Sequence, residues 1–88
     1  MLDINTDGET WVMSPAELKS AFRSAESGGV IVYAVGDLGR TRRMALGARA
    51  DLVEETANYA YRLWRIGAAE IPQKKLGKNK YEYWLRKA

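Results

Sequence analysis

Apolar positions first recur at helical spacing after residue 14. The segment Ser14-Pro15-Ala16-Glu17 is typical of a helix start, with Ser14 as N-cap, proline in the first turn and Glu17 completing a capping box. The positions that follow on one helical face are Leu18, Ala21, Phe22 and Ala25. We expect the pair Gly28-Gly29 to end this helix.

The pattern then changes to a short continuous apolar run. Residues 30–35, VIVYAV, are rich in β-branched side chains and predict a buried strand. Gly36-Asp37-Leu38-Gly39 breaks this run as a turn. In the basic segment 40–49 that follows, we expect a short helix over residues 41–46 that ends near Gly47.

The second half of the chain predicts a long helix and a closing hairpin. A wide apolar stripe indicates a helix over residues 48–66, with Gly67 at the C′ position. Residues 67–87 then predict two strands around the turn Gly77-Lys78-Asn79. Tyr81, Tyr83 and Leu85 alternate along the returning strand and should face the core, which leaves Trp84 on the other face. Contact with a partner and stacking on bases are alternative roles for Trp84, but we expect its side chain to pack within the fold.

The amino-acid composition excludes several kinds of chemistry. The chain has 88 residues, no cysteine and no histidine, so it has no disulfide framework, no thiolate and no imidazole base or ligand. We expect one domain over residues 14–88, preceded by an N-terminal arm over residues 1–13 that is extended or forms a hairpin around Asp7-Gly8. No enzymatic activity and no cofactor are predicted, because the carboxylates stand where helix caps and turns account for them.

Two short motifs are discounted. Residues 3–8, DINTDG, match the first half of a calcium loop, but position twelve is Ser14 rather than glutamate, so we expect an Asp-Gly turn and no metal. Residues 36–39, GDLG, have the form of the GxxG loop of KH domains, yet a strand precedes them here, which favours an ordinary turn.

Charge is distributed unevenly along the chain. The net charge is +3, with −4 over residues 1–37 and +7 over residues 38–88. This asymmetry predicts a positive surface able to attract phosphate, although interleaved surface charges would also account for it. No apolar run approaches about 20 residues and the start is acidic and polar, so we expect a cytoplasmic protein without a membrane segment.

The order of elements, and the final segment GAAEIPQKKLGKNKYEYWLRK in particular, resembles small winged helix-turn-helix domains of bacterial and phage DNA-binding or regulatory proteins. The resemblance covers residues 15–87 and implies an α+β fold with the order helix, strand, short helix, long helix and β-hairpin. It also implies that the long helix enters the major groove of double-stranded DNA while the wing lies against the backbone. Transcription regulation, or another regulatory role in a phage or bacterium, is the function it implies.

Nine basic residues are the candidates for contact with nucleic acid: Arg40, Arg42, Arg43, Arg49, Arg62, Lys74, Lys75, Lys78 and Lys80. Lysines on a hairpin also protect a sheet edge from aggregation, and Arg49 is open to pairing with acids of the long helix. Those acids, Asp51, Glu54 and Glu55, would repel phosphate. The alternative function is therefore a protein-binding module, such as a phage-encoded modulator of a host complex. Its contact surface would consist of these acids and Trp84. The sequence also leaves a homodimer as an alternative to a monomer.

Overall fold

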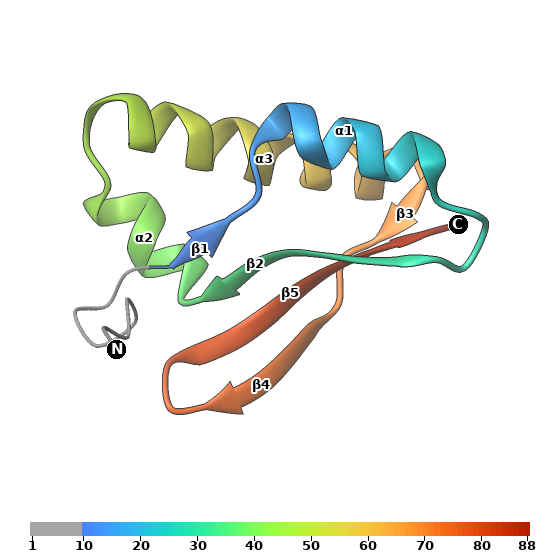
Figure 1. Cartoon of the computed structure of the whole chain (residues 1–88). Coiled ribbons are helices and arrows are strands. Elements are labelled where there is room, and N and C mark those ends of the chain that lie inside the picture. The colour runs from blue at the N-terminus through green and yellow to red at the C-terminus, as the bar shows by residue number, and fades with distance from the viewer. Residues whose placement is uncertain (1–9) are drawn as a thin grey trace.

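The computed structural model describes residues 10–88, in which three helices and five strands form an α+β fold (Figure 1). The elements are β1 (Trp11–Val12), α1 (Pro15–Ser24), β2 (Val30–Gly36), α2 (Leu38–Met44), α3 (Gly47–Arg65), β3 (Ala69–Glu70), β4 (Gln73–Gly77) and β5 (Lys80–Lys87). The predicted α+β class is therefore confirmed. The predicted turn at Asp7-Gly8 lies outside the described residues.

The strands make one antiparallel sheet in the order β1-β2-β5-β3, with β4 also paired to β5. β2 and β5 are the central pair, and their register sets Ile31 opposite Leu85 and Ala34 opposite Tyr83. Leu85 and Ala34 are fully buried, and α1 and α3 lie over that face of the sheet (Figure 1). The fold thus has two layers, helices on one side and the sheet on the other.

The core lies between these two layers. Its deepest side chains are Leu18 of α1, Val53 of α3 and Leu85 of β5, each with no exposed surface. Tyr83 and Leu85 are buried as the alternation along the last strand predicts, while Tyr81 is half-buried. Burial raises the pKa of Tyr33 in β2 to about 12, because the core disfavours its charged form.

Local capping signals explain where most of the helices begin and end. Ser14 and Glu17 form the predicted capping box at the start of α1. At the end of α3, Gly67 has φ +78°, its N–H bonds to Trp64 O at 3.1 Å, and Ala68 N bonds to Leu63 O at 2.9 Å. These two bonds are a Schellman motif, so the predicted C′ role of Gly67 is confirmed.

Several helix boundaries differ from the sequence prediction. α2 ends at Met44 rather than at residue 46, and Gly47, which the sequence predicts as the end of this helix, is the first residue of α3. α1 ends at Ser24 rather than at Gly28-Gly29. α2 begins at Leu38 rather than at Thr41, because the Asp37 side chain caps the helix by accepting a hydrogen bond from Arg40 N at 3.0 Å. Asp37 therefore starts a helix within the segment that the sequence predicts as a turn.

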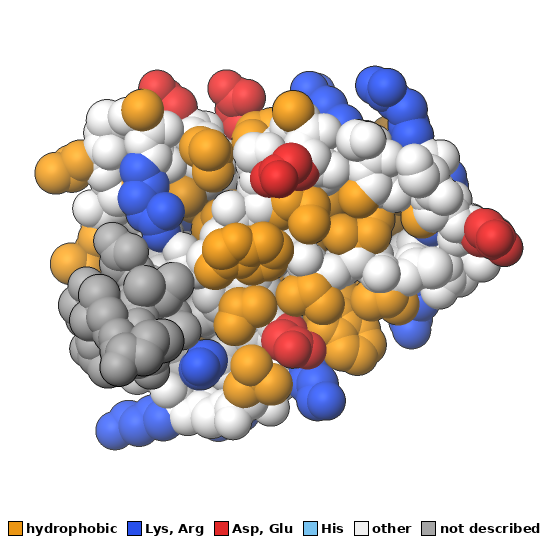
Figure 2. Space-filling view, in the orientation of Figure 1, with side chains coloured by type: hydrophobic (Ala, Val, Ile, Leu, Met, Phe, Trp, Pro, Cys, Tyr) orange, Lys and Arg blue, Asp and Glu red, His pale blue; other side chains and the backbone are white. Residues whose placement is uncertain are grey.

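The sheet face away from the helices carries an apolar patch. Antiparallel register places Trp11, Val35 and Glu82 in one row across β1, β2 and β5 on this face. Val32 and Trp84 form the next row, and Trp84 Nε1 donates to Glu82 Oε1 at 3.1 Å. No helix of residues 10–88 covers this face. Figure 2 views the molecule from the side, where hydrophobic side chains gather between the helix layer and the sheet.

Candidate nucleic-acid interface

The three arginines of α2 have different surroundings. Arg40 and Arg43 are exposed and make no ion pair with any residue between 10 and 88. Arg42 is bound by Glu54 of α3, with Nε 2.6 Å from Oε1 and Nη2 3.2 Å from Oε2. This two-point contact raises the pKa of Arg42 and lowers the pKa of Glu54, since it stabilises both charged forms. Two of the three guanidinium groups are therefore available to an anion.

All four candidate lysines lie on the β4–β5 hairpin. Lys74, Lys75 and Lys78 are exposed and Lys80 is half-buried. Gly77 pairs with Lys80, so the turn consists of Lys78 and Asn79, and Asn79 has a left-handed φ of +55°, which asparagine tolerates better than most residues. These lysines, too, make no ion pair within the described part of the chain.

The sheet register brings these two groups of bases to the same end of the molecule. Gly36, the last residue of β2, pairs with Tyr81 near the start of β5. α2 therefore begins beside the strand that leads out of the hairpin turn, and Leu38 N donates to Tyr83 Oη at 3.0 Å. Figure 1 shows α2 and the β4–β5 turn toward one end and the C-terminal end of α3 toward the other.

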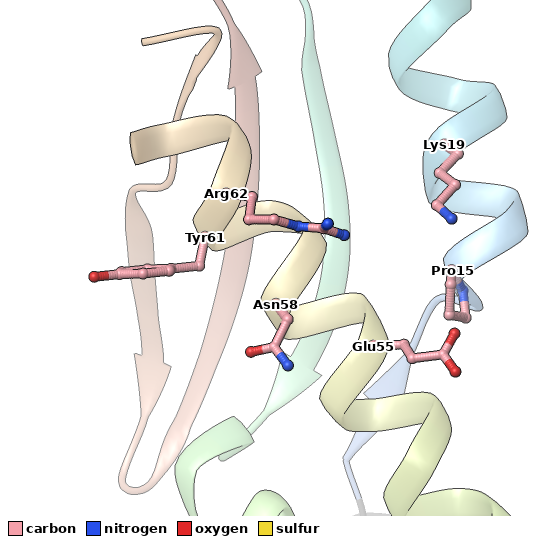
Figure 3. Close-up of a pocket in the computed structure, with 6 residues that line it drawn as sticks. All are labelled: Pro15, Lys19, Glu55, Asn58, Tyr61 and Arg62. Atoms are coloured by element: carbon pink, nitrogen blue, oxygen red, sulfur yellow. The ribbon is translucent and has the colours of Figure 1, made fainter. Parts of the chain in front are cut away.

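Two predicted residues lie elsewhere. Arg49, in the first turn of α3, donates through Nη2 to the carbonyl oxygen of Thr10, so it binds the chain itself. Arg62 lies on the C-terminal half of α3 and lines a groove against α1 together with Lys19 (Figure 3). The nine predicted bases are thus not brought together on one surface.

The acids and Trp84 proposed for a protein partner are also separated. Asp51 and Glu55 are exposed on α3, in the helix layer, while Glu54 is bound by Arg42. Trp84 lies on the sheet, on the face that alternates with the buried Tyr83 and Leu85. The helix layer therefore carries the acids and the opposite layer carries Trp84.

Sequence reasoning missed a second basic cluster, between α1 and the end of α3. Lys19, Arg23, Arg62 and Arg65 line one hollow of about 700 Å³ whose other lining residues are Tyr59, Leu63 and Ile66. The spacing of Lys19 and Arg23 is the i, i+4 spacing that puts two side chains on one helical face. Only the packing of α1 on α3 shows that this face adjoins Arg62 and Arg65.

Comparison of the chain with protein-family models, curated proteins and solved structures finds no match. Within residues 10–88, no helix is long and apolar enough to cross a membrane. Nor do three acidic side chains gather there in a way that could hold a metal ion, and the calcium-loop segment 3–8 lies outside this range. What the chain binds must therefore be inferred from the geometry of residues 10–88.

Proposed function

We propose that this chain is a non-catalytic domain that binds double-stranded DNA, with the regulatory role of a small bacterial or phage protein. The observation that carries the proposal is that the exposed α2 arginines and the hairpin lysines lie toward the same end of the sheet. Arg40, Arg43, Lys75 and Lys78 are the four bases that we assign to phosphates. Lys74 and Lys80 flank them on the same hairpin.

The element order supports a winged-helix arrangement for this surface. α2 and α3 follow one another across a two-residue connection, Ala45-Leu46, and the hairpin comes after α3. In winged-helix domains the helical pair meets the groove and the hairpin meets the backbone. The acids at the start of α3 argue that phosphate contact, rather than reading of base edges by that helix, supplies the binding energy here.

Fluorescence anisotropy of a labelled mixed-sequence duplex tests this function. About four phosphate contacts should weaken binding roughly a hundredfold between about 50 and 200 mM salt, because each contact releases condensed counterions. The double variants Arg40→Ala/Arg43→Ala and Lys75→Ala/Lys78→Ala should each weaken binding and flatten its salt dependence. Lys19→Ala/Arg62→Ala, which removes the same charge from the groove, is the matched control.

Absence of binding at about 50 mM salt, with protein up to tens of micromolar, would exclude this function, because non-specific binding alone registers in that range. The second candidate is then a protein-binding module without DNA affinity. One observation favours it: Trp11 and Val30, on the sheet face that no helix of residues 10–88 covers, are 43% and 46% exposed.

A further inference from the structure

The outer surface of the helix layer carries a groove between α1 and α3. It consists of two adjoining hollows of about 540 and 700 Å³ that share Lys19 and Arg62 as lining residues. In Figure 3 the side chains of Lys19 and Arg62 extend into the space between the two helices, while Tyr61 points away. The groove is separate from the end of the sheet that holds the α2 arginines and the hairpin turn.

The floor of the groove is apolar, and its C-terminal end is open to solvent. Leu63 is buried and Tyr59 is half-buried beneath it, and Ile66 is 76% exposed at its C-terminal end. An exposed aliphatic side chain makes no favourable contact with a phosphate, but it gains by burial against an apolar side chain of a partner. The floor therefore selects a ligand that has an apolar face.

The rim of the groove is cationic at the same end. Lys19 and Arg23 of α1 stand across from Arg62 and Arg65 of α3, and no acid lines this hollow. Lys19 Nζ lies 5.6 Å from the Tyr59 ring centroid and Arg65 Cζ lies 5.9 Å from that of Tyr61. None of the four makes an ion pair within residues 10–88, so the charge complementary to this rim must come from a ligand.

The groove has the shape and the polarity for a helix. α1 and α3 run side by side across the helix layer (Figure 1), and a third helix laid between two others is a common way to bury an amphipathic stripe. From Glu55 to Ile66 the rise along α3 is about 16 Å, which a partner helix of roughly 12 residues would cover.

We propose that this groove binds an acidic amphipathic helix of a partner protein. Its apolar side chains rest on Tyr59, Leu63 and Ile66, and its carboxylates meet the four cations at the rim. Glu55 lies at the opposite end of the groove, beside Pro15 (Figure 3), so that end repels acidic residues and sets the direction of the bound helix. The proposal is independent of DNA binding, because it uses no α2 or hairpin residue.

Fluorescence anisotropy with a labelled peptide of about 16 residues tests the proposal. The probe carries Leu at positions i, i+3, i+4 and i+7 and Glu at its remaining helical positions. Lys19→Glu/Arg62→Glu should weaken its binding by at least about tenfold, because both rim charges change sign. The control Arg40→Glu/Arg43→Glu changes the net charge by the same amount at α2 and should leave peptide affinity within about twofold.

Two further variants have opposite expected signs. Glu55→Gln should raise affinity for the peptide, since it removes the one acid that lines the groove. Ile66→Ser should lower affinity in a manner that persists at high salt, because it removes apolar contact rather than charge. Both side chains are exposed, so neither change should disturb the fold.

The proposal is overturned by any of three results. The first is no peptide binding at the highest soluble concentration. The second is equal weakening by the groove and α2 charge reversals, which would mean that attraction is only to the net charge. The third is loss of duplex binding, rather than peptide binding, in Lys19→Glu/Arg62→Glu, which would make the groove a nucleic-acid surface. Failure of duplex binding in every variant would exclude the DNA function and leave this proposal standing.

Discussion

Thr10 is a polar side chain held in the interior by three hydrogen bonds to two residues. It is 2% exposed. Its hydroxyl donates to Asp37 O at 3.2 Å and accepts from Asp37 N at 3.1 Å and from the Thr41 hydroxyl. Because every hydrogen-bonding capacity of this hydroxyl is used, Thr10 has no freedom to move aside. It fixes the point where β1, the end of β2 and the start of α2 meet.

Gly36 is the residue on which this arrangement depends most. Its φ is +131°, and a Cβ atom built on it would lie 2.7 Å from Thr10 Oγ1 and 3.0 Å from Thr10 Cα. Gly36→Ala therefore combines backbone strain with a clash against an immobile neighbour. We expect it to lower the free energy of unfolding by about 2 to 4 kcal/mol, measured by urea denaturation.

Gly77→Ala in β4 is the matched control. No atom lies within 4 Å of a Cβ at Gly77, and its φ is not in the left-handed region. This substitution should change stability by less than about 1 kcal/mol. Equal destabilisation by the two alanine substitutions would mean that the close contact of Gly36 with Thr10 is not what makes Gly36 necessary.

The arginines show what residue types alone do not reveal about the candidate site. Sequence groups Arg40, Arg42, Arg43 and Arg49 as one basic segment. In the fold, Arg42 is bound by Glu54, and Arg49 by the backbone of Thr10, 39 residues away along the chain. Partners so distant in sequence are set by the packing of α3 against α2 and β1, which local patterns do not encode.

At the element scale, the end of α1 is held by a side chain from the other end of the chain. Lys87 Nζ donates to Phe22 O and to Ala25 O, each at 3.0 Å, and lies 4.9 Å from the Phe22 ring centroid. A cation bound to the last carbonyl groups of a helix also opposes the negative end of the helix dipole. Lys87 thereby ties α1 to β5.

Lys87→Met tests this contact, since methionine keeps much of the apolar stem and removes the charge and the donors. We expect a loss of about 1 to 3 kcal/mol in the free energy of unfolding, because two carbonyl groups lose a charged donor. Lys75→Met on the exposed β4 strand removes the same group where it makes no ion pair within residues 10–88, and should be close to neutral. If both variants unfold at the same urea concentration, the cap contributes nothing to stability.

The helix boundaries show which parts of the fold the sequence predicts. The start of α1 and the end of α3 follow from local signals, the capping box at Ser14 and the left-handed Gly67, and both are found as expected. The end of α1 depends on a distant residue as well: Ala25 N bonds locally to Phe22 O, but Lys87 completes the cap from 62 residues away. The sequence of Asp37 and the residues after it is typical of a helix cap, but Gly36 and Gly39 on either side of it are also typical of a turn.

In the molecule as a whole, every other element except β1 contacts β5 or α3. β5 pairs with β2, β3 and β4, and α3 packs against α1, α2 and β3. β1 has only two residues, as does β3, and it pairs with β2. Met13, the residue after β1, accepts a hydrogen bond from Thr56 Oγ1 of α3 at 2.7 Å. Removing any one layer exposes the shared core around Leu18, Val53 and Leu85.

We therefore expect residues 10–88 to unfold in one cooperative transition, and the three tryptophans allow this to be measured. Trp11 lies on β1, Trp64 on α3 and Trp84 on β5, so three variants that each keep one tryptophan, with phenylalanine at the other two positions, report on three elements. In each variant the urea midpoint from fluorescence should coincide with that from far-UV circular dichroism, with a slope of about 1 kcal/mol/M. Trp11 is the critical probe, because only two hydrogen-bonded residues hold its strand in the sheet. A fluorescence change of Trp11 at lower urea than that of Trp84 would mean that β1 detaches before the core opens, and that the contacts of Thr10 and Thr56 are too weak to make it part of the cooperative unit.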